Sequence, residues 1–180
     1  VIDPAFLLDK DELDKMFKTQ LEKERGRYVL SMFLTDNPHH WKAAESFAKK
    51  ADCKHVIIPY CGFSYMQRAE IAADAGLEDV IELIRGAEYI LTDSFHITAL
   101  AIIYRKQFYT FQRFKETAFF STNERVRNLL EIADCSNRFI NYSEKCINDM
   151  TDIDYKNIVP KLNKVIEKSK KYLEKAVGEE

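Results

Sequence analysis

The sequence predicts an α/β fold of the Rossmann-like class, a parallel sheet flanked by helices. Short, almost continuously apolar segments of strand length alternate with longer segments whose apolar residues recur at helical spacing. Continuous apolar strands are typical of parallel sheets, because helices cover both faces of each strand. No internal repeat or low-complexity linker divides the 180 residues. We therefore expect one domain over residues 1–180.

The first part of the chain is expected to hold one strand and two helices. Residues 1–8 are predicted to be extended, because Pro4 disfavours a helix, and a short helix covers residues 9–17. Residues 28–34 form a nearly continuous apolar strand. The motif Asp36-Asn37-Pro38 begins the next helix with a capping side chain and a proline in the first turn. This helix buries one face, made of Trp41, Ala44, Phe47, Ala48 and Ala51.

The middle of the chain continues the alternation of strands and helices. Residues 55–60 form the second strand, and a loop follows as far as residue 76. The next helix carries apolar residues at helical spacing, and Gly86 is predicted to terminate it. Residues 88–92 form the third strand and residues 107–111 the fourth. A helix that begins near Ser94 lies between these two strands, and its apolar residues include Ala99, Leu100 and Ile103.

The last part of the chain is predicted to be mainly helical. After a loop over residues 112–122, Asn123 is expected to cap a helix. Residues 138–141 form a short edge strand. The final helix covers about residues 155–177 and is expected to pack across the domain through one apolar face. The members of that face are Leu162, Val165, Ile166, Leu173 and Val177.

Composition excludes several classes of protein. The formal net charge of −2 conceals no strongly basic half, so nucleic acid is not an expected partner. The four cysteines contain no CxxC motif, so no metal site is expected and a reducing, cytoplasmic compartment fits best. The longest apolar run, residues 97–104, is too short to span a bilayer. The chain opens with neither a signal peptide nor an initiator methionine, and we expect it to be part of a longer protein.

The segment Thr92-Asp93-Ser94-Phe95-His96 is the strongest candidate for a ligand site. Ligands of open parallel sheets bind beyond the carboxyl ends of the strands, and this segment follows the third strand. If Ser94 caps the next helix, the N–H groups of Phe95, His96 and Ile97 remain free to bind an anion. His96 could add its imidazole or transfer a proton near neutral pH. In the structural alternative, Asp93 and Ser94 only cap the helix and His96 fills a gap.

Basic residues from neighbouring loops are expected at the same edge of the sheet. Arg113 and Lys115 follow the fourth strand, and Arg125 opens the next helix. The planar guanidinium of arginine suits carboxylates and phosphates, because it donates two parallel hydrogen bonds. Each of the three is also compatible with a solvated surface position. Their shared location favours a role in binding an anionic ligand.

Four segments resemble the polysaccharide pyruvyl transferase family. Residues 2–8, IDPAFLL, resemble the family's DPxFLL segment, and residues 84–100, IRGAEYILTDSFHITAL, resemble its signature around TDSFHG. The strand opening KQFY and the helix TNERVRNLL, residues 106–109 and 122–130, resemble the blocks that follow. These blocks occur in the family's order between residue 2 and about residue 141. The TDSFH block is the most specific of them.

The resemblance implies the C-terminal, donor-binding half of a two-domain, GT-B-like enzyme. Such an enzyme moves a pyruvyl group from phosphoenolpyruvate to a sugar hydroxyl of a surface polysaccharide or its precursor, as a ketal. Phosphoenolpyruvate is a donor substrate, and no cofactor is implied. The implied location is cytoplasmic, including the inner face of the membrane. The N-terminal domain would supply the other wall of the cleft and much of the acceptor site, so this chain alone is expected to be inactive.

The resemblance also implies roles for individual residues. His96 would be the catalytic acid or base, and Ser94 and Phe95 would contribute to the donor site. Arg113 or Lys115 would hold the charge of the donor, and we add Arg125 because of its position at the same edge. The chain departs from the family at Ile97, where glycine is usual, and the branched side chain is expected to narrow the approach to the backbone. It also departs at Ser94, where some members have arginine.

Two other functions remain open from the sequence. One is a GT-B glycosyltransferase half that binds a nucleotide sugar, with Glu116 or Glu124 placed for a ribose diol. The other is a non-catalytic Rossmann-like binding module, in which His96 would be buried. A nicotinamide-binding domain is not expected, since no GxGxxG motif follows a predicted strand.

Overall fold

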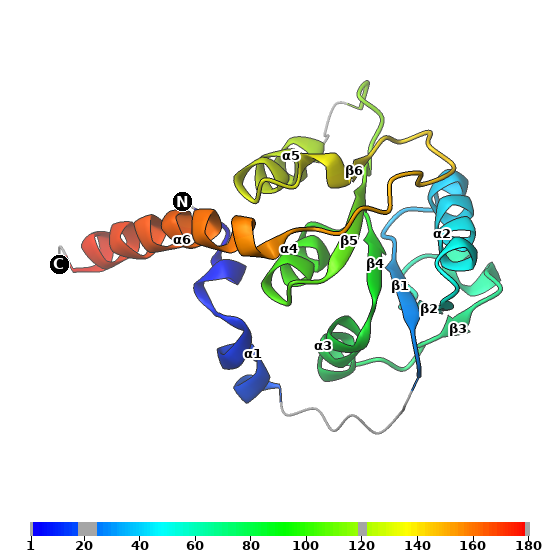
Figure 1. Cartoon of the computed structure of the whole chain (residues 1–180), viewed down its shortest axis with the longest axis horizontal. Helices are drawn as coiled ribbons and strands as arrows, with labels where there is room; N and C mark the ends of the chain where they lie inside the picture. Colours follow the sequence, from blue (N-terminus) through cyan, green and yellow to red (C-terminus); the bar gives the residue numbers. More distant parts are fainter. Residues whose placement is uncertain (1, 18–24, 119–121, 179–180) are drawn as a thin grey trace.

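The computed structural model describes residues 2–17, 25–118 and 122–178. Val1 of the predicted extended segment and residues 119–121 of the predicted loop lie outside this part. Within it, six strands form one sheet in the order β3-β2-β1-β4-β5-β6 (Figure 1). Every neighbouring pair is parallel, which confirms the predicted fold class. The strands are β1 (Tyr28–Met32), β2 (Lys54–Ile57), β3 (Glu70–Ile71), β4 (Tyr89–Thr92), β5 (Gln107–Phe111) and β6 (Phe139–Ile140).

Helices cover both faces of the sheet and bury two apolar clusters. One face packs against α3 (Leu77–Gly86), α4 (Phe95–Ile103) and α5 (Asn123–Ile132), and the other against α2 (Pro38–Lys50). Successive strand residues point to opposite faces, as Leu30 and Val29 do in β1. Both kinds of position are therefore buried, which explains why the strands are apolar without alternation.

Helix starts follow the predicted capping chemistry at two positions. The Asn37 side chain accepts the N–H of His39 at 3.0 Å, and Pro38 opens α2. Ser94 occupies the N-cap of α4. At α5 the prediction was wrong, because Thr122 stands at the N-cap and Asn123 is the first helical residue. The Asn123 amide instead accepts the N–H of Phe114 at 3.1 Å and donates to its carbonyl at 2.7 Å, which braces the loop after β5.

Gly86 ends α3 as predicted, but without the left-handed conformation of a glycine cap. It is the last residue of α3, and Gly26 is the glycine with positive φ among the described residues. A Cβ at Gly86 would lie 2.6 Å from the Tyr28 hydroxyl oxygen. That hydroxyl donates to the Leu83 carbonyl at 2.6 Å. Close approach of the Tyr28 side chain, and not a left-handed helix end, therefore requires glycine here.

Three segments differ from their predicted conformation. The N-terminal segment contains a 3-10 helix, η1 (Pro4–Leu7), because Asp3 caps it and proline is accommodated in a first turn. The helix α1 (Lys10–Met16) follows, with a capping box formed by Asp9 and Glu12. The segment predicted as a loop up to residue 76 also contains η2 (Gly62–Met66) and the edge strand β3. A further 3-10 turn, η3 (Ser136–Arg138), precedes β6.

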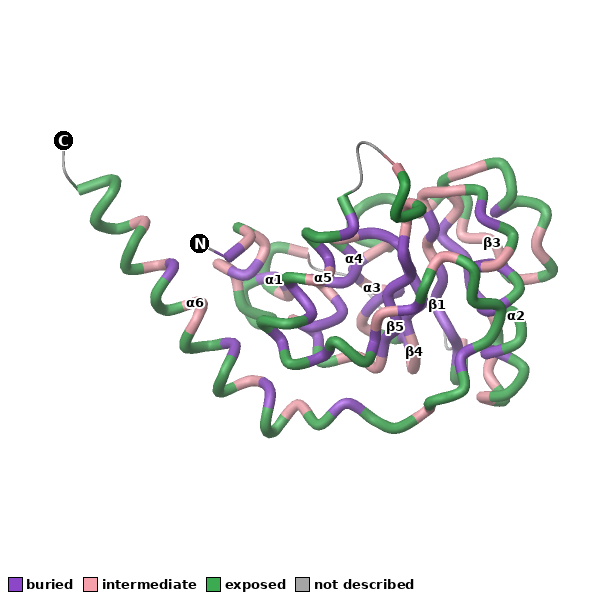
Figure 2. Tube along the Cα trace, turned by 90° about the horizontal axis from the view of Figure 1, so that it is seen from above, coloured by how far each residue is buried: buried purple, intermediate pink, exposed green. Residues whose placement is uncertain are grey.

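The C-terminal helix α6 (Tyr155–Val177) packs against the domain as far as Ser169 and then projects from it (Figures 1 and 2). Leu162 is 6% exposed, whereas Tyr172 and Val177 are 60% and 77% exposed. The expectation that the whole apolar face packs across the domain was wrong for the end of the helix, where Val177 is exposed. The packed part contacts α5 and η1. Of the described helices, none combines the length and apolarity needed to cross a membrane.

Candidate functional site

A small hollow of about 150 Å³ lies where β4 and β5 end and α4 begins. It brings together five residues predicted for the site, Ser94, Phe95, His96, Arg113 and Arg125, and leaves out Lys115. The complete lining consists of Leu34, Asp93, Ser94, Phe95, His96, Phe111, Arg113, Thr122, Asn123, Arg125, Val126 and Phe139. Its place at the carboxyl edge of the sheet is the one expected for a ligand site of this fold.

Local hydrogen bonds shape the turn between β4 and α4. The Thr92 hydroxyl donates to the Met32 carbonyl at 2.7 Å and accepts the N–H of Ser94 at 3.0 Å. The Ser94 hydroxyl then accepts the N–H of Ile97 at 3.5 Å. The prediction of three free N–H groups is thus reduced to two. Those of Phe95 and His96 have no acceptor among the described residues, so the helix start retains donors for an anion.

Ile97 does not narrow the hollow, contrary to expectation. Its side chain is 5% exposed, packs into the apolar core and is absent from the lining. The position three residues after the N-cap places it on the face of α4 that meets the sheet. The residue that replaces the family's glycine therefore serves core packing.

Asp93 is buried and joins the site to the loop after β1. Its carboxylate accepts the N–H of Leu34 and the hydroxyl of Thr35, both at 2.6 Å. Burial raises the pKa of Asp93, although these two hydrogen bonds and the charge of Arg113 oppose the shift. The sequence suggested only a capping role for this residue. In the structure it fastens two loops that meet at the edge of the hollow.

His96 is exposed at the hollow. Its ring meets that of Phe95 edge-on, with centroids 5.6 Å apart and an interplanar angle of 89°. The imidazole is thus accessible to a ligand that occupies the hollow, as proton transfer requires. A non-catalytic binding module was expected to bury this residue, and the exposure does not fit that alternative.

Arg113 is half-buried and supplies a cation to the hollow. Its Nε is buried and has no hydrogen-bond partner within the described part of the chain. The guanidinium lies 5.1 Å from the centroid of the Phe114 ring. Buried donors in native proteins are nearly always paired, so an unpaired donor beside a hollow indicates a place for an acceptor. A carboxylate or phosphate would satisfy it.

Arg125 and Lys115 are engaged elsewhere. Arg125 Nη2 lies 2.8 Å from Asp3 Oδ2, and its Cζ lies 4.1 Å from the centroid of the Phe95 ring. Lys115 lies outside the hollow, with Nζ 5.7 Å from the centroid of the Tyr142 ring. Of the three basic residues predicted for donor binding, Arg113 is the best placed to meet an anion.

Neither glutamate considered for a ribose diol lines the hollow. Glu116 accepts hydrogen bonds from Gln112 at 2.9 Å and from Arg127 at 2.6 Å. Glu124 lies on the same arginine at 3.6 Å. Across residues 2–17, 25–118 and 122–178, no group of three or more His, Cys, Asp or Glu side chains is placed to hold a metal ion.

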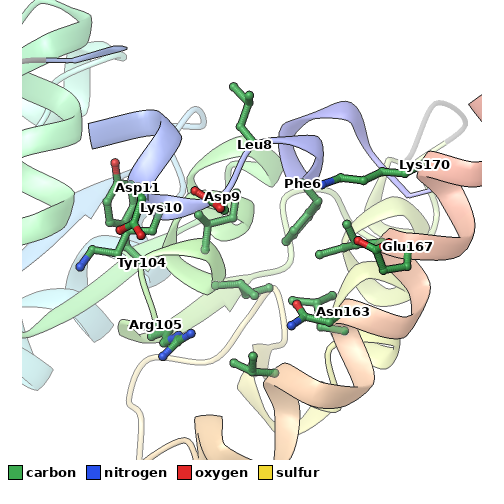
Figure 3. A pocket seen from close by; sticks show the side chains of 15 residues that line it. Phe6, Leu8, Asp9, Lys10, Asp11, Tyr104, Arg105, Asn163, Glu167 and Lys170 are labelled. Carbon is green, nitrogen blue, oxygen red and sulfur yellow. The ribbon is translucent and has the colours of Figure 1, made fainter. Parts of the chain in front are cut away.

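A larger hollow is a groove beneath α6, at the other end of α4 from the candidate site (Figure 3). It measures about 600 Å³ and contains no residue predicted for the site. Its walls come from η1, α1, the end of α4 and α6. The apolar lining includes Phe6, Ile102, Leu162 and Ile166, and the charges alternate in sign through Asp9, Lys10, Asp11, Arg105, Glu167 and Lys170.

Comparison with known proteins identifies a family and several similar solved structures. The polysaccharide pyruvyl transferase family model matches residues 1–113, a range that includes Asp93, His96 and Arg113 but not Arg125. No curated protein sequence matches the chain. The structure of UDP-GlcNAc 2-epimerase from Methanocaldococcus jannaschii in complex with UDP-GlcNAc and UDP is similar, with a TM-score of 0.54 and 16% identity. The match covers 81% of this chain and 44% of that one.

The second similar structure is E. coli heptosyltransferase WaaC with ADP-2-deoxy-2-fluoro heptose, with a TM-score of 0.46 and 12% identity. The match covers 87% of this chain and 48% of that one. At such identities the likeness of the epimerase shows the fold alone. The matched region spans less than half the length of either protein.

Proposed function

The chain belongs to the polysaccharide pyruvyl transferase family, and from this premise we propose that it forms the donor-binding half of a pyruvyl transferase. The donor is phosphoenolpyruvate, and the acceptor is a sugar hydroxyl pair of a surface polysaccharide or its precursor. The observation that carries the proposal is Arg113, whose unpaired Nε lies at the same hollow as His96 and the start of α4.

Phosphoenolpyruvate matches the hollow in charge and size. Its phosphate and its carboxylate call for two anion-binding features. The free N–H groups of Phe95 and His96 at the helix start provide one, and the guanidinium of Arg113 provides the other. The hollow of about 150 Å³ is smaller than the roughly 300–1,000 Å³ of sites for larger ligands. A three-carbon acid therefore suits it better than a nucleotide sugar.

Ketal formation defines what the proton-transfer group must do. Two acceptor oxygens bond to the central carbon of phosphoenolpyruvate, and the bond from that carbon to the phosphate oxygen breaks. Of the two protons that the hydroxyls lose, one is balanced by the proton gained at the methylene carbon and the other by the proton that leaves with phosphate. We assign these proton transfers to His96, a proposal supported by its exposure at the hollow.

The acceptor is proposed to bind between this domain and a second domain of the same protein. His96 is exposed at the hollow, and the family resemblance implies a cleft whose opposite wall belongs to another domain. We place the enzyme in the cytoplasm, at the inner face of the membrane where lipid-linked glycan precursors would be accessible.

Binding of phosphoenolpyruvate to this chain tests the donor site directly. Isothermal titration calorimetry of the wild type, Arg113→Gln and Lys115→Ala makes a matched set, since both residues are cations after β5 but only Arg113 lines the hollow. We expect Arg113→Gln to weaken binding by about tenfold or more and Lys115→Ala to leave it within about twofold. Equal effects of both variants would contradict the assignment. Tighter binding of UDP-GlcNAc than of phosphoenolpyruvate would favour the nucleotide-sugar alternative.

Turnover tests the role of His96. In the protein that contains both domains, phosphate release from phosphoenolpyruvate in the presence of a glycan acceptor should be lost in His96→Ala. His39→Ala serves as the control, because His39 is a histidine of α2 outside the hollow. Full turnover by folded His96→Ala would remove His96 from the mechanism.

A further inference from the structure

Asp3 connects the N-terminal segment to the candidate site. Its Oδ1 accepts the N–H of Ala5 at 3.0 Å, which caps η1, and its Oδ2 accepts a hydrogen bond from Arg125 Nη2 at 2.8 Å. The Asp3 side chain is 15% exposed. Both oxygens have a partner, so the carboxylate is fixed between η1 and α5.

The partner of Asp3 is part of a stack that ends at His96. The Cζ of Arg125 lies 4.1 Å from the centroid of the Phe95 ring. The Phe95 ring contacts the His96 ring edge-on, with the two centroids 5.6 Å apart. A guanidinium held at one end by a carboxylate has little freedom to leave the ring below it. Asp3 therefore lies at one end of a series of contacts that runs through Arg125 and Phe95 to the ring of His96.

The segment that carries Asp3 is itself anchored to the rest of the domain. The N–H of Ile2 donates to the buried Ser169 hydroxyl of α6 at 2.9 Å. Phe6 of η1 is buried, and η1 packs against both α4 and α6. A continuous series of contacts thus runs from α6 through η1, Asp3 and Arg125 to His96.

Electrostatics keep Asp3 ionised in this arrangement. Burial alone raises the pKa of Asp3, but the N–H of Ala5, the guanidinium of Arg125 and the charge on His96 together lower it below its ordinary value. The ionised carboxylate balances the charge of Arg125. Arg113 is then the cation that remains to bind the anionic donor substrate.

We propose that Asp3 is a positioning residue, which holds His96 in its working orientation through Arg125 and Phe95. Arg125 is then a brace for the site and not a ligand of the donor. The functional meaning of this orientation rests on the proposed transferase reaction. The contact itself can be tested without that reaction.

Nuclear magnetic resonance of the histidine rings tests the contact. The sequence has four histidines, so ring-labelled protein gives a spectrum in which His96→Gln identifies the His96 signals. Asp3→Asn keeps an oxygen to cap η1 but loses the charge that orients Arg125. We expect it to shift and broaden the His96 signals while those of His39 stay in place, and Asp3→Glu to restore them in part. Identical His96 signals in wild type and Asp3→Asn would overturn the proposal.

Kinetics of the protein that contains both domains separate positioning from donor binding. Asp3→Asn should lower kcat by about tenfold, because small misplacements of a reacting group are costly, and change KM for phosphoenolpyruvate by less than about twofold. Arg125→Gln should match it, and the double variant should be no worse than either alone. Asp9→Asn, which alters the cap of α1 outside the site, is the control.

Two kinetic outcomes would overturn the proposal. Full kcat in folded Asp3→Asn would show that His96 needs no such brace. A raised KM for phosphoenolpyruvate with unchanged kcat in these variants would show that Arg125 binds the donor substrate instead. If the wild type releases no phosphate from phosphoenolpyruvate, the proposed function fails, and the ring spectra still decide whether Asp3 positions His96.

Discussion

Two of the hollows in the described structure differ both in size and in the chemistry of their lining. The groove beneath α6 measures about 600 Å³ but is lined by apolar side chains and by charges of alternating sign. The hollow at the start of α4 measures about 150 Å³ and combines free N–H groups, an exposed imidazole and an unpaired arginine donor. A larger volume offers more room, but only unsatisfied polar groups can select a ligand by its chemistry.

A buried polar atom without a hydrogen-bond partner indicates a binding site only where its residue also lines a hollow. Besides Arg113, four side chains of the described chain have such an atom, namely His40, Trp41, Arg127 and Arg138. None of these four lines either hollow. The coincidence of a donor and a hollow at Arg113 is therefore more informative than either observation alone.

The largest expected effect concerns two buried histidines on the α2 side of the sheet, and it is tested by lowering the pH. Burial lowers the pKa of His40 and of His55 to about 4. Between pH 6.5 and 4 the unfolded chain binds protons that the folded chain excludes, so stability is complete above pH 6.5 and falls as the pH drops through this window. Each histidine should remove on the order of a few kcal/mol from the free energy of unfolding.

Urea unfolding at pH 7.5, 5.5 and 4.5 measures this loss. The His55→Gln variant should lose about half of the acid sensitivity, because one of the two groups is removed. Both histidines lie on the α2 side of the sheet, away from the groove. Equal stability at pH 7.5 and 4.5 would show that neither histidine is held neutral by the fold.

The next effect separates the groove from the small hollow. Leu162 is a buried residue of the groove, and Leu162→Ala should lower the free energy of unfolding by about 2–4 kcal/mol through lost packing. The affinity for phosphoenolpyruvate, measured by calorimetry, should stay within about twofold. Tyr172→Ala, on the exposed end of α6, should cost less than about 0.5 kcal/mol and serves as the control. A large loss of affinity in Leu162→Ala would make the groove part of the donor site.

A smaller effect measures the geometry of the small hollow. Arg113→Lys keeps the positive charge but loses the planar pair of donors, so the affinity for phosphoenolpyruvate should fall by about threefold to tenfold. The melting temperature should be unchanged or slightly higher, because a buried donor without a partner is removed. Full affinity in Arg113→Lys would mean that the positive charge alone, and not the planar pair of hydrogen-bond donors, holds the ligand.

The smallest effect links the two regions. Ser169→Ala removes the acceptor for the Ile2 N–H and should cost about 1 kcal/mol of stability, measured by urea unfolding. If η1 transmits the position of α6 to the site, the ring signals of His96 should shift slightly in the same variant. A stability loss without any change at His96 would confine the coupling to η1.

The sequence predicted the parts of the fold that depend on local chemistry. Continuous apolar segments identified the central strands, because strands buried on both faces need no polar side chain. Asn37 and Ser94 identified two helix starts, since a short polar side chain there accepts an unpaired N–H group. The site segment around His96 follows from the same logic, as the loop after a central strand of a parallel sheet.

Other properties were decided by neighbours that are distant in the sequence. Lys115 and Arg125 share the edge of the sheet with Arg113, but Tyr142 and Asp3 determine where their charges lie. Ile97 points into the core because of its place on α4, and Gly86 is required by Tyr28. The end of α6 beyond Ser169 is mostly exposed, as at Tyr172 and Val177, which its apolar spacing did not indicate.

By itself, the sequence predicted the fold class, five of the six strands in their order along the chain and the segment that carries the candidate site. These follow from periodicity and capping, which act within a few residues. Only the tertiary structure decided which cation at the hollow is free and which is neutralised. That choice depends on ion pairs and ring contacts between residues up to 122 positions apart, as between Asp3 and Arg125, and no local pattern encodes such a pairing.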